Sequence, residues 1–174
     1  RLWTEDHITH NGKFYQLKDV SLRPKPIQNP LPIWWAGEVK SIPRAARYAE
    51  VIDPPWPTLD AVKNEYVPGL ALECEKWGTH TKLGGWFYTL VTPGREMTSA
   101  ETDEWFGPLV GHWNDMRIHE RSFAGAPAQV ANQINTYRAA GMEHFVLDFQ
   151  RHGLDHGNTT IEQMEIFVDS VLPL

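Results

Sequence analysis

Short apolar runs alternate with amphipathic helical stretches along this chain, and no other feature restricts its possible folds as strongly. Runs rich in apolar residues occupy positions 33–36, 49–53, 84–91 and 144–149, and helix patterns follow each of them. Strands that alternate with amphipathic helices pair in parallel through right-handed crossover connections. The fold class is therefore predicted to be α/β, either half of a (β/α)8 barrel or most of a small doubly wound sheet.

The helices predicted in the first half of the chain have recognisable starts and ends. A helix that begins at Ser41 would bury four residues at helical spacing, namely Ile42, Ala45, Ala46 and Ala49. Thr58 is a suitable N-cap for a second helix, which runs to Gly78 with a kink at Pro68-Gly69. One helix is thus expected after each of the first two strands.

Three more helices are predicted in the second half. Thr98 and Glu101 have the spacing of a capping box, and Gly107-Pro108 is expected to break the helix that they start. Another helix opens at Pro127, where proline is tolerated. The last helix starts at Thr159 and is expected to carry an apolar face made of Ile161, Met164, Val168 and Val171.

The first 31 residues are predicted to form a β-hairpin and a Pro-rich lead-in. Asn11-Gly12, a preferred two-residue turn, lies between β-prone flanks within residues 8–22. The prolines of "LRPKPIQNPLP" then exclude regular structure before the strand at 33–36, whose unbroken apolarity suits burial on both faces. Residues 32–174 carry the four βα units, and all 174 residues are predicted to form a single domain.

Charge and composition exclude several classes of partner. The net charge is −6, and no run of Lys or Arg is longer than a pair, so neither nucleic acid nor an anionic membrane is expected to bind. No apolar run reaches the roughly 18 to 20 residues of a membrane span. The single cysteine permits no intrachain disulfide, which favours a cytoplasmic location.

Three stretches of the sequence resemble a known family. They are "GKFYQLKDVSLRPKPIQNPLPIWWAG", "RAARYAEVID" and "FAGAPAQVANQINTYRAAGMEHFVLDF", followed by a closing helix that ends in "VLP". Together they resemble the C-terminal half of the bacterial luciferase-like monooxygenases, which are flavin- or deazaflavin-dependent TIM-barrel oxidoreductases. The resemblance implies that the four strands are the fifth to eighth of the barrel, that FMN or a deazaflavin is the cofactor, and that the substrate is a small organic molecule.

A half-barrel would leave parallel strand edges unpaired. A complete barrel of this type needs about 250 residues, and open edges are templates for pairing with other chains. We therefore expect the chain to associate with an N-terminal half-barrel or with a second copy of itself. A non-catalytic half-barrel that self-associates as an interaction or scaffold module is the alternative to an enzyme.

The loop after the first predicted strand is the main candidate for cofactor binding. In a barrel the chemistry lies at the carboxyl ends of the strands. Amides at the start of a helix can hold a phosphate, and the resemblance carries that role to the loop formed by Gly37, Glu38, Val39, Lys40 and Ser41. A carboxylate at Glu38 would repel a phosphate unless it points away, and the alternative is a tight turn with Ser41 as an ordinary N-cap.

Two further groups of residues lie at strand ends. The resemblance suggests that Trp56 lines a flavin pocket, and Trp86 is a second aromatic candidate, although either could simply pack in the core. After the last strand, Arg151 or His152 could meet an anionic cofactor or substrate, with Asp148 orienting either of them. No catalytic residue is assigned and no metal site is expected, which fits a protein whose cofactor supplies the reactive group.

Overall fold

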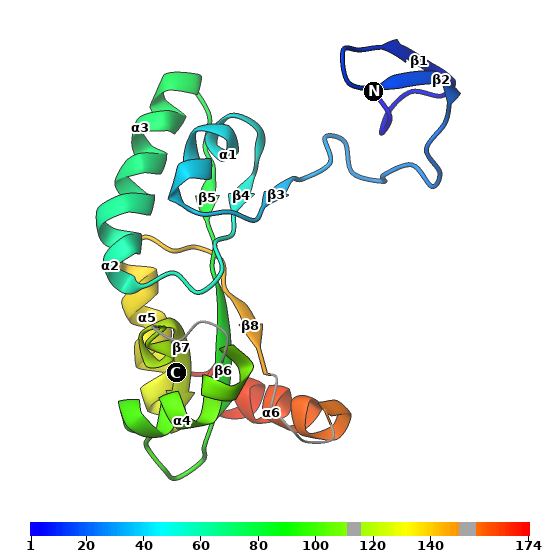
Figure 1. Cartoon of the computed structure of the whole chain (residues 1–174). Helices are drawn as coiled ribbons and strands as arrows, with labels where there is room; N and C mark the ends of the chain where they lie inside the picture. The colour runs from blue at the N-terminus through cyan, green and yellow to red at the C-terminus, as the bar shows by residue number, and fades with distance from the viewer. Residues whose placement is uncertain (111–115, 150–155) are drawn as a thin grey trace. The chain divides into compact units, whose positions relative to one another are not determined.

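The computed structural model describes residues 1–110, 116–149 and 156–174. They form two compact units, Arg1–Ile33 and Trp34–Leu174 (Figure 1). The division lies close to the predicted boundary between residues 31 and 32. Among the described residues, none of the helices combines the length and the apolarity that a membrane crossing requires.

The first unit is built on a two-stranded hairpin. Strands β1 (Ile8–Asn11) and β2 (Gln16–Val20) pair in antiparallel fashion. Asn11 is the last residue of β1 and lies opposite Gln16, and the Gly12 amide donates to the Tyr15 carbonyl over 2.9 Å. The turn therefore consists of residues 12–15, and the predicted two-residue turn at Asn11-Gly12 is wrong.

The second unit is organised around one interrupted strand. Its first part is β5 (Lys82–Leu83) and its second part is β6 (Trp86–Val91), with Gly84 and Gly85 between them. A Cβ at Gly85 would lie 2.7 Å from the Met142 Cε and 2.8 Å from the Phe87 Cε2, so a larger residue there would displace both side chains. At this interruption the backbone of Gly85 lies close to Met142, in the segment that precedes the last strand.

All other strands of this unit align in parallel with the central strand, directly or through a neighbour. One sheet has the order β3-β4-β5, where β3 is Trp34–Trp35 and β4 is Val51–Ile52. The other has the order β7-β6-β8, where β7 is Ser122–Gly125 and β8 is Val146–Asp148. A parallel bridge between Pro55 and Trp86 links β4 to the start of β6. The four predicted strands are present in shorter form, within an α/β arrangement of parallel sheets.

Strand β7 was missed by the sequence analysis. Its residues, Ser122 to Gly125, include only one strongly β-prone side chain, Phe123. All four are buried, and β7 pairs with β6 along its whole length. Tertiary pairing therefore creates this strand where local propensity is weak.

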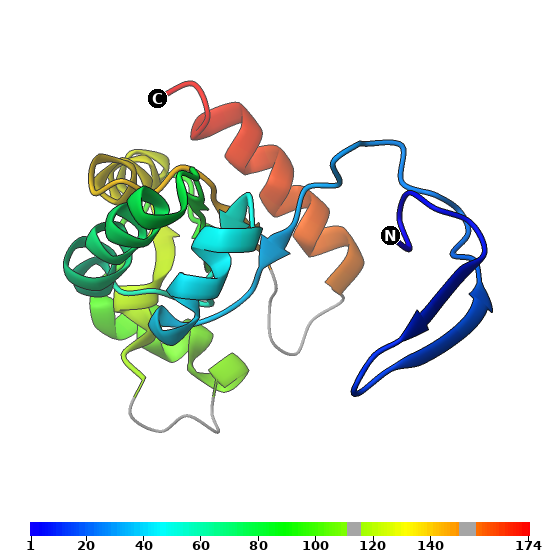
Figure 2. The same cartoon turned by 90° about the horizontal axis from the view of Figure 1, so that it is seen from above.

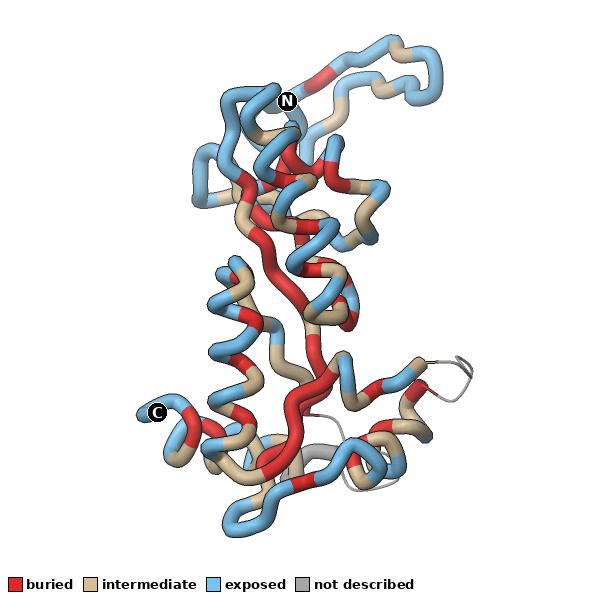
Figure 3. The backbone as a smooth tube through the Cα atoms, turned by 90° about the vertical axis from the view of Figure 1, so that its left-hand side faces the viewer, coloured by how far each residue is buried: buried red, intermediate tan, exposed pale blue. Residues whose placement is uncertain are grey.

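Helices connect and cover the strands. Their bounds are η1 (Val39–Ser41), α1 (Ile42–Tyr48), α2 (Leu59–Ala61), α3 (Val67–Trp77), α4 (Ser99–Val110), η3 (Ile118–Arg121), α5 (Pro127–Ala139) and α6 (His156–Ser170), with a π-helical turn η2 (Val62–Tyr66) between α2 and α3. Ile42, Ala45, Ala46 and Ala49 are buried, as predicted for α1. Figure 3 shows that the buried positions run along the strands, while the outer faces of the helices are exposed.

The predicted caps at Thr58, Gly78 and Thr98 are confirmed, whereas α6 begins at His156, ahead of its predicted start at Thr159. The Thr58 hydroxyl accepts a hydrogen bond from the Ala61 amide over 3.2 Å, and Gly78 ends α3 in the left-handed region at φ 63°. The Thr98 amide donates to the Glu101 carboxylate over 2.8 Å, and the Glu101 amide donates back to the Thr98 hydroxyl over 3.3 Å. These are the reciprocal bonds of a capping box.

Two predicted helix irregularities are wrong: the kink in the helix from Thr58 lies earlier than predicted, and the break in α4 is absent. The helix from Thr58 is irregular in the π-helical turn before Val67, and Pro68 lies in the first turn of α3, where its missing amide is harmless. Gly107-Pro108 does not break α4, which continues to Val110. Pro108 has no N–H to donate to the Glu104 carbonyl, four residues earlier in the helix. Both residues are exposed, so water can bond to that carbonyl instead.

The prediction for the last helix is wrong in its buried face. Ile161, Met164 and Val168 are 57%, 46% and 54% exposed, and only Val171 of the predicted set is buried. Instead, α6 (orange to red in Figure 2) buries Phe167 and directs Gln163 to the central strand, and Val171, directly after the helix, is also buried. An apolar stripe on α6 is thus left uncovered by the described residues.

Three glutamine side chains hold backbone groups that lack strand partners. Gln163 accepts from the Val91 amide over 2.8 Å and donates to the Val91 carbonyl over 3.1 Å. Gln129 makes the same two bonds to Met97, over 3.0 and 2.8 Å, and Gln133 makes them to Ala124. Each amide therefore acts as a neighbouring strand would.

We predict that Gln129→Leu lowers the free energy of unfolding by about 1 to 3 kcal/mol, because it leaves the amide and carbonyl of buried Met97 without partners. Asn132→Leu is the matched control, since it also replaces an amide side chain of α5 by leucine, but at an exposed position. Urea unfolding followed by far-UV circular dichroism measures both. Equal effects of the two substitutions would show that the paired hydrogen bonds of Gln129 contribute nothing.

Asp53, directly after β4, carries a poorly compensated carboxyl group. Its Oδ1 is buried and has no hydrogen-bond partner among the described residues. Desolvation raises the pKa of Asp53 above its ordinary value of 3.8, and the nearby His144 opposes this only in part. The folded state therefore favours the protonated form of Asp53, and this group destabilises the fold increasingly as the pH rises through the raised pKa.

Asp53→Asn is expected to raise the free energy of unfolding at about pH 7 relative to the wild type, with a gain that shrinks toward about pH 4. The substitution removes the charge but keeps the shape of the side chain. Asp169→Asn, at an exposed position of α6, is the control and should show no such trend. A gain that does not change with pH would contradict the assignment to the charge of Asp53.

Candidate functional site

The loops that follow β3 and β4 enclose a cavity of about 450 Å³. Both loops lie at the carboxyl ends of parallel strands, where barrel-type sheets carry their sites. The π-helical turn and the segment that leads into β7 complete the lining. Its residues are Glu38, Val39, Lys40, Pro55, Trp56, Pro57, Thr58, Ala61, Glu65, Tyr66, Met116 and Arg121.

The candidate loop from Gly37 to Ser41 folds tightly into η1. The Ser41 amide donates to the Glu38 carbonyl over 2.7 Å. A Cβ at position 37 would lie 2.5 Å from the Ser41 Oγ, so only glycine permits this close return of the chain. Ser41 is the N-cap residue of α1 but makes no side-chain capping bond, so the tight turn of the alternative is present and the ordinary side-chain cap is not.

The charged side chains of this loop are turned to solvent. The Lys40 Nζ lies 3.3 Å from Glu38 Oε2, and the two side chains are 84% and 71% exposed. An ion pair this exposed contributes little stability, and both side chains can rearrange around a ligand. The expected repulsion from Glu38 is thus moderated by its partner and its exposure.

Tyr66 closes the inner side of the cavity. It is 5% exposed, and it lines the cavity together with Val39. Burial raises the pKa of Tyr66 to about 12, and the Glu38 carboxylate acts in the same direction, while Arg121 acts in the opposite one. The hydroxyl therefore stays protonated, and both charged groups lie near it.

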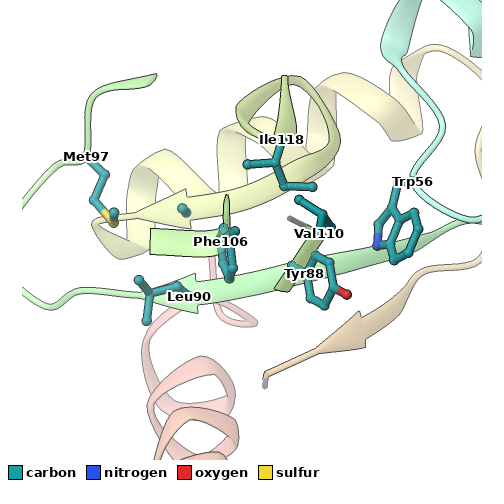
Figure 4. Packing of buried hydrophobic residues seen from close by; sticks show 8 residues of the cluster. Trp56, Tyr88, Leu90, Met97, Phe106, Val110 and Ile118 are labelled. Atoms are coloured by element: carbon teal, nitrogen blue, oxygen red, sulfur yellow. The ribbon is translucent and has the colours of Figure 1, made fainter. Parts of the chain in front are cut away.

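Trp56 joins the cavity to an aromatic stack. It is buried and has a positive φ of 45°, an unfavourable conformation for this residue type. Its amide donates to the Trp86 carbonyl over 2.9 Å, and its ring centroid lies 4.8 Å from that of Trp86 and 5.4 Å from that of Tyr88. Figure 4 shows Trp56 beside Tyr88, with Phe106 of α4 next along the cluster.

The aromatic candidates thus differ in accessibility. Trp56 packs against the rings of Trp86 and Tyr88, and Tyr88 also stacks on Phe106 at 5.6 Å. Trp86 is only partly buried. Of the two predicted tryptophans, Trp56 lines the cavity, whereas Trp86 is outside its lining and packs against Trp56. Trp34, predicted to be covered on both faces, is 49% exposed, because β3 is the edge of its sheet.

Of the polar residues predicted at the end of the last strand, Asp148 is among the described residues. Asp148 is partly buried at the end of β8 and lies opposite Tyr88 in the register of the sheet. Burial chiefly, and the Asp148 carboxylate to a lesser degree, raises the pKa of Tyr88. Arg151 and His152 lie outside the described residues.

Arg121 is one of the cavity residues that the sequence analysis missed. It ends η3 directly before β7, and its Nη1 donates to the Trp56 carbonyl over 2.8 Å. Because β7 was not predicted, nothing in the sequence placed Arg121 at the level of the candidate loop. Tyr66 was missed for a similar reason, since it belongs to a helix whose irregular turn aims it at the loop.

The chain is similar to several known proteins. A family model described as luciferase-like monooxygenase matches residues 1–64. An FMNH2-dependent dimethylsulfone monooxygenase of Pseudomonas putida is 23% identical over 206 residues, which cover 99% of this chain and 54% of that protein. The chain therefore spans about half the length of this relative.

Solved structures share the fold. An F420-dependent secondary alcohol dehydrogenase, in complex with an F420-acetone adduct, superposes with a TM-score of 0.73 at 18% identity, over 98% of this chain and 58% of the other. The monooxygenase RslO1 of Streptomyces bottropensis superposes with a TM-score of 0.71 at 17% identity, over 99% and 57%. Together with the family model, these likenesses confirm the resemblance of the chain to the luciferase-like monooxygenase family.

Proposed function

We propose that this chain is the cofactor-binding portion of a luciferase-like, flavin- or deazaflavin-dependent oxidoreductase that acts on a small organic substrate. In this proposal its parallel strands are the fifth to eighth strands of a (β/α)8 barrel. One observation carries the proposal. The cavity at the carboxyl ends of β3 and β4 brings the Gly37–Ser41 loop together with Trp56 and a cation, Arg121.

The residues present suit a flavin-type cofactor. The loop returns so closely at Gly37 that a side chain there would collide with Ser41, so glycine is what permits the short turn that carries Val39 and Lys40 to the cavity. The partly buried face of Trp86, supported by Trp56, can pack against a planar ring. When bound, the cofactor would supply the redox chemistry, while these residues bind and orient it and exclude water.

The choice between FMN and a deazaflavin stays open. The named relatives include an FMNH2-dependent monooxygenase and an F420-dependent dehydrogenase, and the lining residues would accept either ring. We extend the proposal to a partner: an N-terminal half-barrel, or a second copy of the chain, would pair with the strand edges. In the sheet orders of the described residues, β3 and β5 end one sheet, and β7 and β8 end the other.

A non-catalytic, self-associating half-barrel is the second candidate. It is favoured by the apolar stripe on α6, where Ile161, Met164 and Val168 are exposed together. Exposed patches of this kind mark surfaces that are covered by another chain. The stripe is compatible with both candidates, and only cofactor binding separates them.

Trp86→Leu is expected to weaken the binding of FMN, or of a deazaflavin cofactor, several-fold to about tenfold, because it removes the aromatic surface for the ring. Trp77→Leu, at a tryptophan that is 43% exposed at the end of α3, is the control and should not change the affinity. Quenching of cofactor fluorescence measures the cofactor affinity of both variants. If the natural polypeptide in its assembled form binds neither type of cofactor, the enzyme proposal fails.

Val168→Glu is expected to shift the 174-residue chain toward a monomer, because a charge on the stripe opposes its burial against another chain. Leu72→Glu, on α3 at a position 66% exposed, is the control for added charge. Sedimentation velocity at micromolar concentration measures the proportions of monomer and self-associated chain for each variant. A wild-type chain that is monomeric throughout this range would speak against the proposed self-association.

A further inference from the structure

The first unit has almost no apolar core of its own. The structure describes all of residues 1–33, and Ile8 is the only one of them that is buried. Figure 3 shows this part of the chain exposed over most of its length. A two-stranded hairpin with so little burial is marginally stable by itself. The large apolar side chains that it leaves exposed are Leu2, Trp3, Phe14, Tyr15, Leu22 and Ile27.

Polar contacts, rather than apolar packing, fix the shape of the hairpin. His7 Nδ1 lies 2.9 Å from Asp19 Oδ1, and the His7 amide donates to Ser21 Oγ over 3.0 Å. The Asp19 amide donates to Thr9 Oγ1 over 3.3 Å. All these groups are exposed to water, so each contact adds little stability. The hairpin therefore has a defined shape but needs a further surface to stabilise it.

The turn of the hairpin presents two aromatic side chains to solvent. Phe14 and Tyr15 are 82% and 75% exposed. The turn is closed by the Gly12 amide, which donates to the Tyr15 carbonyl, and by Gln16 Nε2, which donates to the Gly12 carbonyl, each over 2.9 Å. Turns usually carry small or polar residues, whereas aromatic residues are enriched in protein interfaces. A preformed turn with two exposed rings is suited to insertion into another surface.

The place of the hairpin in the chain indicates which surface covers it. Residues 21–33 follow the hairpin and lead directly to β3, which ends its sheet among the described residues. In the proposed barrel, an N-terminal half-barrel pairs with that edge. The connecting residues span at most about 45 Å when fully extended. The hairpin is therefore tethered within reach of the structure that pairs with β3.

The similar proteins contain the hairpin region within longer chains. The matching family model covers residues 1–64, which include both strands of the hairpin. The superposition on the F420-dependent dehydrogenase extends over nearly all of this chain but only 58% of the other. The hairpin thus belongs to the shared fold, and proteins with that fold have a further part for it to contact.

We propose that the hairpin unit is an interaction surface for the N-terminal half-barrel, with Phe14 and Tyr15 as its anchoring residues. The inference rests on the proposed function, because it takes this chain as one part of a barrel. The surface that receives the two rings is apolar, since exposed aromatic anchors bind in desolvated pockets. Contact with it supplies the burial that the hairpin lacks.

Hydrogen exchange followed by mass spectrometry tests the inference through the amides of residues 8–20. It compares the natural protein that carries this sequence, in its assembled form, with the 174-residue chain. The amides are expected to exchange at least about tenfold more slowly in the assembled protein, because a covered hairpin must open before its amides exchange. The double variant Phe14→Ser, Tyr15→Ser should remove most of this difference. Lys13→Ser, at an exposed position of the same turn, is the control and should preserve it.

Three results would overturn the inference. Equal exchange in the assembled protein and in the 174-residue chain would show that no N-terminal half-barrel covers the hairpin. Protection that increases with protein concentration would assign the surface to a second copy of the chain. Unchanged protection in the double variant would show that Phe14 and Tyr15 do not anchor the contact.

Failure of the proposed function has a different signature. An assembled protein with a protected hairpin that binds neither FMN nor a deazaflavin coenzyme would overturn the proposed function and leave the inference in place. Cofactor binding by an assembled protein whose hairpin exchanges as fast as in the 174-residue chain would overturn the inference alone.

Discussion

The parallel register of the central strand is the constraint on which the second unit depends. β4 aligns with β5, and β7 and β8 align with β6 on its two sides. A change of register by one residue would move Phe87, which is fully buried against Phe123 at 4.4 Å, to the opposite face. It would also separate Trp86 from Trp56, so the core and the candidate site are specified by the same alignment.

The two faces of this strand have different tasks. Phe87 packs with Phe123 and with Tyr137 of α5, which secures the helix layer. Trp86 and Tyr88 project from the other face and meet Trp56. Tyr137 connects the two sides, because its ring belongs to the core and its hydroxyl holds the loop beside Arg121. Packing of the core and the position of the loop at the candidate cavity are therefore coupled through one buried side chain.

Polar groups on this framework are satisfied to different degrees. Gln129, Gln133 and Gln163 complete the bonding of backbone groups near the ends of β6 and β7. Asp53 has a buried oxygen without a partner among the described residues, and Arg121 has N–H groups to spare. The three glutamines hold the backbone near the strand ends. Arg121 lies beside the candidate site, where a bound cofactor can supply a further hydrogen-bond partner, and a further chain could do the same for Asp53.

The sequence alone determined the alternation of strands and helices, the caps at Thr58 and Thr98, and the buried face of α1, because these depend on local periodicity and local hydrogen bonds. It also identified the loop at Gly37 as a sharp strand end. Only the tertiary structure decided that Ser122–Gly125 is a strand, that α6 buries Phe167 instead of its apolar stripe, and that Arg121 lies at the cavity. These outcomes depend on which segments become neighbours in space, and neither propensity nor spacing along the chain contains that information.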